Sequence, residues 1–260
     1  QLGARRIIAV ATSALRESAN AAQLTRAVKD RTGINLRIIS GLEEARIIAN
    51  GITIHENEVD GLVALVDVGG GSAEISICQH HRVLHSASFP LGASRIAQEL
   101  ALSAKPYQRK DQRKEIAQLR TAIRARLLTV ISKECWPVVP KVIGSSGTIK
   151  AVMSLCKKKK NPKIYKVKAL RKLVKTLSCS STFRPRHHRR IPAWRAETIL
   201  GAAILLEEII EALGAKRIAL TRYSLTQGLL NQEILCRQLQ KATEERRRSI
   251  PALPLHCQAA

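Results

Sequence analysis

The chain has 260 residues, enough for one large hydrophobic core or two modest ones, and its hydrophobic content of 45% is that of an ordinary globular protein. Lysine and arginine outnumber aspartate and glutamate by 44 to 20, so the formal net charge is +24 and polyanions are the expected partners. Aromatic residues make up only 3% of the chain, which leaves few stacking platforms and argues against a reader of single-stranded nucleic acid.

Short strands and helices alternate in the first part of the chain. The hydrophobic pattern predicts, in order, a strand at 6–10, a polar turn at 11–20, a helix at 21–31, a strand at 36–39 and a helix at 42–50. Strands in meander order are then expected at 62–68, 73–78 and 82–89.

Helices dominate from residue 93 onward. The pattern predicts helices at 93–102, 108–133, 149–155, 193–213 and 225–248, and strands at 138–143 and 218–220. Two basic loops are expected at 157–162 and 178–192, and the end of the chain beyond Arg248 is expected to be mobile. This order predicts an α/β architecture with a mostly helical insertion.

The segment Leu65-Val-Asp-Val-Gly-Gly-Gly-Ser-Ala-Glu74 carries the clearest chemical signal. Gly69, Gly70 and Gly71, followed by Ser72, allow close approach of an anion, because no Cβ intervenes and positive φ angles are open. Successive free N–H groups in such a turn form an anion-binding concavity. The flanking carboxylates, Asp67 and Glu74, fit beside a phosphate only if a divalent cation lies between them. The pattern predicts a metal–phosphate site at the tip of a β-hairpin; the alternative is a glycine-rich turn with two solvated acids.

A second loop has a similar composition. Gly144, Ser145, Ser146, Gly147 and Thr148 follow a predicted strand and precede a helix, a junction typical of phosphate or nucleotide binding. A plain turn explains them equally well.

The cysteines and the hydropathy bear on location. The six cysteines stand far apart with no C-x-x-C spacing, which favours thiols in a reducing cytosol over disulfides or a metal site. No stretch reaches about 18 uninterrupted apolar residues, so no membrane span is expected. We therefore expect a cytoplasmic protein.

Motifs in one order resemble the exopolyphosphatase / guanosine pentaphosphate phosphatase (Ppx/GppA) family, which has the actin-like (ribonuclease H-like) two-domain ATPase superfold. They are Ala11-Thr-Ser-Ala-Leu-Arg-Glu17 with Asn20, Ser40-Gly-Leu-Glu-Glu-Ala-Arg46, Asp67-Val-Gly-Gly-Gly-Ser-Ala-Glu74, Leu91-Gly-Ala-Ser-Arg95 and Gly144-Ser-Ser-Gly-Thr148. The segments 197–203 and 227–230 also fit the second domain of the family, so the resemblance covers roughly 6–230.

The resemblance implies a Mg²⁺-dependent hydrolase that releases the terminal phosphate of inorganic polyphosphate or guanosine pentaphosphate. It implies that Glu44 positions or deprotonates the attacking water, that Asp67 and Glu74 lie beside the metal, and that Arg16 reaches the phosphates. The loop 69–72 matches the second phosphate loop of the family. Without the resemblance, Glu44 and Arg16 read as an ordinary acidic helix residue and a surface charge. Glu43 is expected to be a solvated structural residue.

Two departures from the family pattern are visible. The family opens with an Asp-x-Gly-Ser-Asn-Ser phosphate loop, and no such turn occurs in this sequence. We therefore interpret the chain as N-terminally truncated: 1–57 as an incomplete first domain, 58–235 as the second domain with a helical insertion, and 236–260 as a basic, mobile tail. The family also carries Arg-Glu-Gly where this chain has Thr226-Gln227-Gly228.

Three functions therefore stay open: the phosphohydrolase, an inactive module that binds polyphosphate or nucleotide without cleaving it, and, least favoured, a nucleic-acid binder. Between the two family substrates, the net charge favours inorganic polyphosphate. Basic residues at 157–160, Lys163, Lys166, Lys168 and 184–190 are candidates for a track along such a chain. A homodimer is the candidate assembly.

Overall fold

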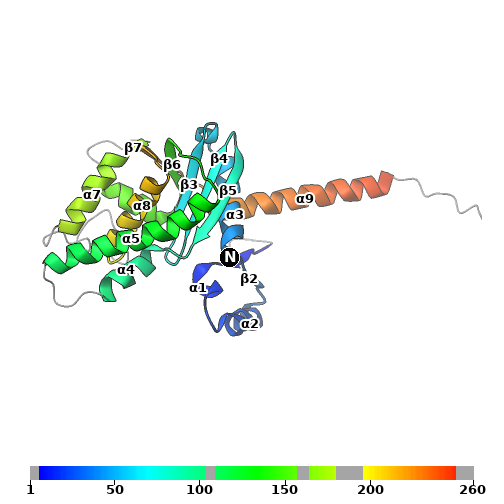
Figure 1. The fold of residues 1–260 in the computed structure, drawn as a ribbon. Coiled ribbons are helices and arrows are strands. Elements are labelled where there is room, and N and C mark those ends of the chain that lie inside the picture. The colour runs from blue at the N-terminus through cyan, green and yellow to red at the C-terminus, as the bar shows by residue number, and fades with distance from the viewer. Residues whose placement is uncertain (1–5, 103–108, 157–163, 180–195, 250–260) are drawn as a thin grey trace, which may run out of the picture.

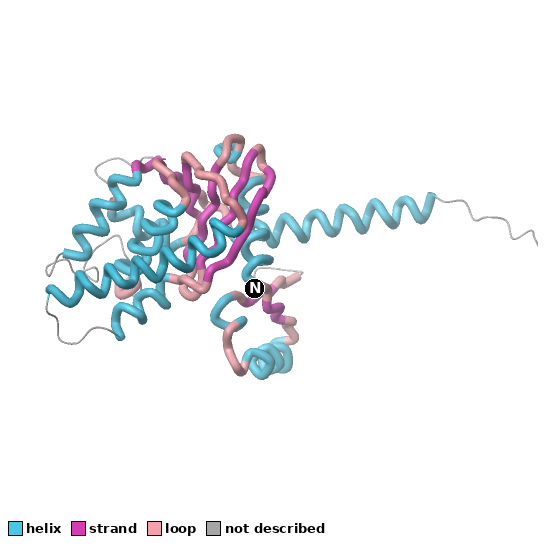
Figure 2. The backbone as a smooth tube through the Cα atoms, viewed as in Figure 1, coloured by secondary structure: helices cyan, strands magenta, loops and turns pink. Residues whose placement is uncertain are grey.

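The computed structural model describes residues 6–102, 109–156, 164–179 and 196–249. It is an α/β structure in which one mixed sheet has helices on both faces and a small two-stranded unit lies beside it (Figures 1 and 2). The strands are β1 Ala9–Ala11, β2 Leu36–Ile38, β3 Val63–Val68, β4 Ala73–Gln79, β5 Arg82–Phe89, β6 Lys141–Gly144, β7 Ile164–Lys166 and β8 Arg217–Leu220. The helices are α1 Ser13–Arg16, α2 Ala21–Thr32, α3 Gly41–Thr53, the 3₁₀ turn η1 Asn57–Val59, α4 Ala93–Leu102, α5 Arg109–Lys133, α6 Gly147–Leu155, α7 Val167–Cys179, α8 Ile199–Ala212 and α9 Leu225–Ser249.

The large sheet has the strand order β5-β4-β3-β6-β8-β7. Its centre, β3-β6-β8, is parallel, whereas β3-β4-β5 is an antiparallel meander and β7 pairs antiparallel with β8. Strand β3 is therefore the element that joins the hairpin to the parallel strands. The sequence-predicted meander is confirmed.

The core lies on both faces of the sheet because β3 is apolar on both. Val63 and Leu65 pack with Ile48 and Ile52 of α3, while Val66 belongs to the larger core formed with α4–α8. Side chains alternate between the faces along a strand, so a continuous apolar run is what a doubly covered strand requires. Figure 1 shows α4, α5, α7 and α8 on one side of the sheet and α3 with the start of α9 on the other.

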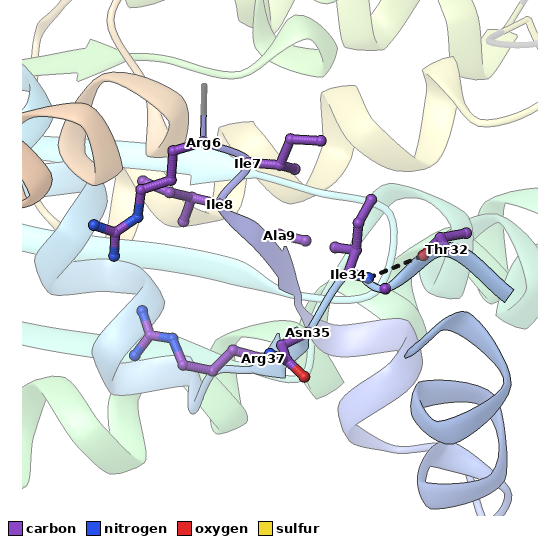
Figure 3. Close-up of a pocket in the computed structure, with 9 residues that line it drawn as sticks. Arg6, Ile7, Ile8, Ala9, Thr32, Ile34, Asn35 and Arg37 are labelled. Carbon is purple, nitrogen blue, oxygen red and sulfur yellow. Dashed lines mark hydrogen bonds between the residues drawn. The ribbon is translucent and has the colours of Figure 1, made fainter. Parts of the chain in front are cut away.

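The small unit consists of the parallel pair β1-β2 with α1 and α2. It has little core of its own: α2 contains no buried residue, and the side chains of Ile7 and Ile8 are 64% and 39% exposed. Figure 3 shows these isoleucines beside an open hollow of about 610 Å³ between the start of β1 and the segment that leads into β2. The unit is connected to the large sheet through α3.

Several elements differ from the sequence predictions. The expected polar turn at 11–20 contains the short helix α1, and the first strand is β1 at Ala9–Ala11 rather than 6–10. The eighth helix begins at Ile199, after a turn at 196–198, rather than at 193. Strand β7 and helix α7 were not predicted. The second basic loop was predicted to begin at residue 178, but α7 continues to Cys179, so its start was wrong. The loop at 157–162, the rest of the loop at 178–192 and the tail beyond Ser249 lie outside the described residues.

The predicted domain boundaries stay predictions, although the one at 235/236 falls within α9, which is continuous from Leu225 to Ser249. In Figure 1 this helix extends away from the body of the molecule. Among the described helices, none combines the length and apolarity needed to cross a bilayer.

The crossing of α3 and α9 depends on two glycines. A Cβ added to Gly228 would lie 1.9 Å from the carbonyl oxygen of Ile47, and one added to Gly51 would lie 2.5 Å from the amide nitrogen of Gly228. Backbone atoms cannot move aside as a flexible side chain does, so the two helices approach this closely only because both positions lack a side chain.

We predict that Gly228→Ala lowers the free energy of unfolding by about 1–3 kcal/mol or more, because the added methyl overpacks the helix crossing. Urea denaturation followed by circular dichroism measures the change. Gly61→Ala is the matched control, since a Cβ there meets nothing within 4 Å, and it should change stability by no more than about 0.5 kcal/mol. Equal stabilities of the two variants would contradict the close crossing.

Candidate active site

The hairpin β3–β4 brings two of the predicted site residues together. Its loop, Gly69 to Ser72, is closed by a hydrogen bond of 2.9 Å from the Gly69 amide to the Ser72 carbonyl. Asp67 and Glu74 are direct partners in the antiparallel register. Directly opposed residues point to the same face, so both carboxylates lie side by side at the base of the loop.

The three consecutive glycines are needed for close approach rather than for unusual dihedral angles. Positive φ among the described glycines occurs at Gly33 and Gly214, so the loop glycines do not use the positive φ angles that are open to them. A Cβ on Gly71 would lie 2.5 Å from the hydroxyl oxygen of Ser13, and a Cβ on Gly92 would lie 2.1 Å from the carbonyl oxygen of Gly70. The loop is thus pressed between the small unit and the start of α4.

The start of α4 fixes the loop in place. The Ala93 amide donates to the Gly69 carbonyl at 2.9 Å and the Ser94 amide donates to the Gly70 carbonyl at 2.9 Å. The first amides of α4 have no acceptor within the helix, and here they donate to the carbonyls of the loop instead. This leaves the loop with a defined backbone shape.

Strand β6 carries the second predicted loop to the same place. It pairs in parallel with β3, and the Ser145 amide donates to the Val66 carbonyl at 3.0 Å. The Ser145 hydroxyl donates to the Asp67 carboxylate, and Ser146 caps α6 by accepting from the Ile149 amide at 3.0 Å. Gly144 ends the strand, and Gly147 and Thr148 form the first turn of α6. The predicted strand-to-helix junction is confirmed, and it lies next to Asp67.

Glu44 reaches the site from the first turn of α3. The hydroxyl of Ser40 caps this helix by accepting from the Glu43 amide at 3.1 Å, which sets the rotation of the turn. Glu43 then faces outward and pairs with Arg37, as expected for a solvated structural residue. Glu44 faces inward and is 7% exposed.

Arg16 holds Glu44 in position. Its Nη1 lies 3.1 Å from Oε2 of Glu44 and donates to the Ile39 carbonyl at 2.9 Å. Burial raises the pKa of the Glu44 carboxyl, Arg16 opposes the rise, and the nearby charge of Asp67 adds to it. In this structure Arg16 contacts the carboxylate; its contact with a phosphate stays a prediction.

Glu74 is a strongly perturbed acid of the site. It is 3% exposed, and its pKa is raised from 4.5 to about 7, first by burial and then by the charge of Glu44, with Asp67 adding to the rise. Hydrogen bonds from Ser72 and Ser88, the latter 2.8 Å long, lower it in part. Burial likewise raises the pKa of Asp67 against the hydrogen bond from Ser145.

The site is suited to a divalent cation together with an anion. Glu44, Asp67 and Glu74 interact electrostatically and are costly to ionise together. Within the described ranges, no group of three acidic, histidine or cysteine side chains has the arrangement of a complete metal cage. Mg²⁺ typically takes one or two carboxylates and completes its shell with phosphate and water, so Asp67 and Glu74 fit that ion.

Arg95 is a site residue whose role the sequence did not reveal. Its Nε donates to the Gly71 carbonyl at 3.1 Å, and its guanidinium pairs with Glu17, which accepts from the Ser13 hydroxyl at 2.8 Å. These contacts connect the glycine loop, Gly69 to Ser72, to α1 of the small unit. The only sequence signal was the membership of Arg95 and Glu17 in two of the family motifs.

We predict that Glu74 makes the metal-free protein less stable as pH rises. The folded state binds this proton more tightly than the unfolded chain, so the stabilisation present below pH 4.5 is lost as pH rises through about 7, by on the order of 3 kcal/mol. Urea unfolding in EDTA across this range should show the loss in the parent chain and a flatter profile in Glu74→Gln. Glu244→Gln, exposed on α9, should keep the parent profile. A parent profile in Glu74→Gln would show that Glu74 has no raised pKa.

Comparison with known proteins agrees with this geometry. The model of the Ppx/GppA phosphatase family matches residues 1–236. Exopolyphosphatase 1 of Mycobacterium leprae is 24% identical over 239 residues, which are 89% of this chain and 69% of that protein.

Two solved structures share the fold. An exopolyphosphatase from Cytophaga hutchinsonii has a TM-score of 0.74 at 23% identity, over 87% of this chain and 74% of the other. The Ppx/GppA enzyme of Aquifex aeolicus has a TM-score of 0.70 at 23% identity, over 88% and 75%. The predicted α/β, actin-like fold is confirmed. Because the family model matches far more than half of the sequence, the chain belongs to the Ppx/GppA phosphatase family.

Proposed function

We propose that this chain hydrolyses the terminal phosphoanhydride bond of inorganic polyphosphate with the help of Mg²⁺. The observation that carries the proposal is the position of Glu44, a buried carboxyl held by Arg16 in electrostatic contact with Asp67 and Glu74. Family members named exopolyphosphatase support the substrate class. The net charge of +24 favours a long inorganic polyanion over guanosine pentaphosphate.

The reaction assigns a distinct task to Glu44. A water oxygen forms a bond to the terminal phosphorus while the bridging P–O bond breaks, which yields orthophosphate and a chain that is one phosphate shorter. A carboxylate whose pKa is raised toward neutrality is a better acceptor for the proton of this water. Arg16, which already touches Glu44, is placed to stabilise charge on the transferring phosphoryl group.

The two loops would bind the phosphates. The backbone from Gly70 to Ser72 and the first turn of α6 would supply N–H groups to the phosphate oxygens. Asp67 and Glu74 would hold Mg²⁺, which when bound neutralises charge on the phosphate oxygens. Positioning and charge neutralisation account for most of the catalysis that phosphoanhydride hydrolysis needs.

An inactive polyphosphate-binding module is the second candidate. It is favoured by one observation: the Asp-x-Gly-Ser-Asn phosphate loop of the family does not occur in this sequence. The two candidates differ in whether phosphate is released, so a single assay separates them. A homodimer stays a prediction under either.

We predict that Glu44→Gln lowers the rate of phosphate release from long-chain polyphosphate about 10²–10⁴-fold, the usual contribution of a general base. Glu43→Gln, the neighbouring exposed acid, should keep nearly the parent rate because it pairs with Arg37 outside the site. Removal of Mg²⁺ with EDTA should abolish release by the parent chain.

The colorimetric phosphate assay decides between the candidates when it is combined with a binding measurement. Release that Glu44→Gln leaves unchanged would contradict the role of Glu44. Tight binding of polyphosphate by the parent chain without any release would instead identify the binding module.

A further inference from the structure

A second basic pocket lies on the helical side of the sheet, between α5 and α7. Both helices pack against α8, away from α3 and α9 (Figure 1). The pocket has a volume of about 340 Å³. Its lining comes from all three helices and consists of Arg113, Ile116 and Arg120 of α5, Arg171, Val174, Lys175 and Ser178 of α7, and Glu207 of α8. None of these residues belongs to the site at the β3–β4 hairpin.

The described lining of this pocket holds more cations than acids. Two of its cations are held by acids of α8: Arg120 pairs with Glu207 and Glu208, and Arg171 pairs with Glu211. The other two cations, Arg113 and Lys175, make no ion pair within the described part of the chain. The paired arginines are pre-oriented, while the unpaired cations leave a charge for a ligand to neutralise.

A buried hydroxyl in the pocket is a second indication of a ligand site. Ser178 lines the pocket, and its Oγ is inaccessible to solvent and has no hydrogen-bond partner among the described residues. Buried polar groups in folded proteins are nearly always hydrogen-bonded, so an unpaired hydroxyl calls for an explanation. The apolar floor formed by Ile116 and Val174 lowers the local dielectric and strengthens any charge contact made above it.

We propose that this pocket is an exosite that binds a phosphate segment of an inorganic polyphosphate chain, apart from the carboxylate site. The choice of this ligand rests on the proposed function. Arginine and lysine donors match phosphate oxygens, and the Ser178 hydroxyl supplies one further donor. The described residues of the lining include no aromatic side chain on which a nucleobase would stack, which favours an inorganic chain over a nucleotide or a single nucleic-acid strand.

The exposed face of α7 extends the basic surface beyond the pocket. Lys168, Arg171, Lys172 and Lys175 are all exposed and are spaced at three and four residues, so they form one stripe along the helix. Lys168 was among the residues expected to line a polyphosphate track, and its position on this stripe supports that expectation. A chain seated in the pocket would continue along these lysines.

The direct test compares two double variants that remove the same charge. Arg113→Gln with Lys175→Gln removes the unpaired cations of the pocket, whereas Lys114→Gln with Lys133→Gln removes exposed lysines of α5 that lie neither in the pocket nor on the α7 stripe. Binding of end-labelled long-chain polyphosphate is measured by fluorescence anisotropy at fixed salt. The pocket variant should bind about tenfold more weakly than the control, the effect of two charge-assisted contacts. Equal affinities of the two double variants would overturn the exosite.

Ser178→Ala tests the hydroxyl separately. Since the hydroxyl has no partner among the described residues, its removal should leave the thermal midpoint of the ligand-free chain unchanged while weakening the binding of polyphosphate. A lowered midpoint with unchanged affinity would assign Ser178 a structural role and count against the proposal.

Kinetics separate failure of the exosite from failure of the proposed function. If the chain is a hydrolase, the pocket variant should raise KM for long chains relative to the control, with kcat unchanged and with turnover of tripolyphosphate unaffected. An unchanged KM for long chains would contradict the exosite. Absence of phosphate release from every variant would refute the hydrolase instead, and the anisotropy comparison would still decide the exosite.

Discussion

The burial of neighbouring carboxylates is the constraint on which the candidate site depends. Glu44 and Glu74 are buried and Asp67 is partly buried, and burial first, then the charges of Glu44 and Asp67, raise the pKa of Glu74 to about 7. A fold retains such a group only if something compensates it. Arg16 and Ser145 do so in part, and a divalent cation with a phosphate would do the rest. The same electrostatics that destabilise the empty site therefore favour the ligand.

The architecture concentrates these groups with few elements. Strand β3 delivers Asp67, its hairpin partner β4 delivers Glu74, and its parallel neighbour β6 delivers the loop at Ser145. Glu44 comes from α3, which also connects the small unit to the sheet. Arg95 adds a link between α1 and the glycine loop. The position of the small unit thus decides whether Arg16 reaches Glu44.

Local pattern was enough to predict the hairpin and its loop. The apolar run before Asp67, the glycines and the alternation after Glu74 each reflect nearest-neighbour geometry, and the structure has them as expected. The packing of these glycines could not be predicted, because close approach by Ser13 and Gly92 depends on segments distant in sequence. The contacts of Ser145 with Asp67 and of Arg95 with Glu17 could not be predicted from local pattern, because they also join segments distant in sequence.

Helix α7 was not predicted, for a different reason. Val167, Leu170, Val174 and Leu177 are buried at spacings of three and four residues, which is the periodicity of an amphipathic helix. The many lysines between them obscure this period in the sequence. The α5–α7 pocket was therefore not predicted, because half of its described lining lies on that helix.

The central claim is that the buried carboxylates form a site for Mg²⁺ with a phosphate chain. Isothermal titration of Mg²⁺ into the chain with pyrophosphate near pH 7, repeated in buffers of different ionisation enthalpy, tests it most directly. Because a bound cation favours the ionised form of Glu74, binding should release protons from the parent chain and fewer from Glu74→Gln. Absence of Mg²⁺-dependent heat, or equal proton release from both proteins, would contradict the claim.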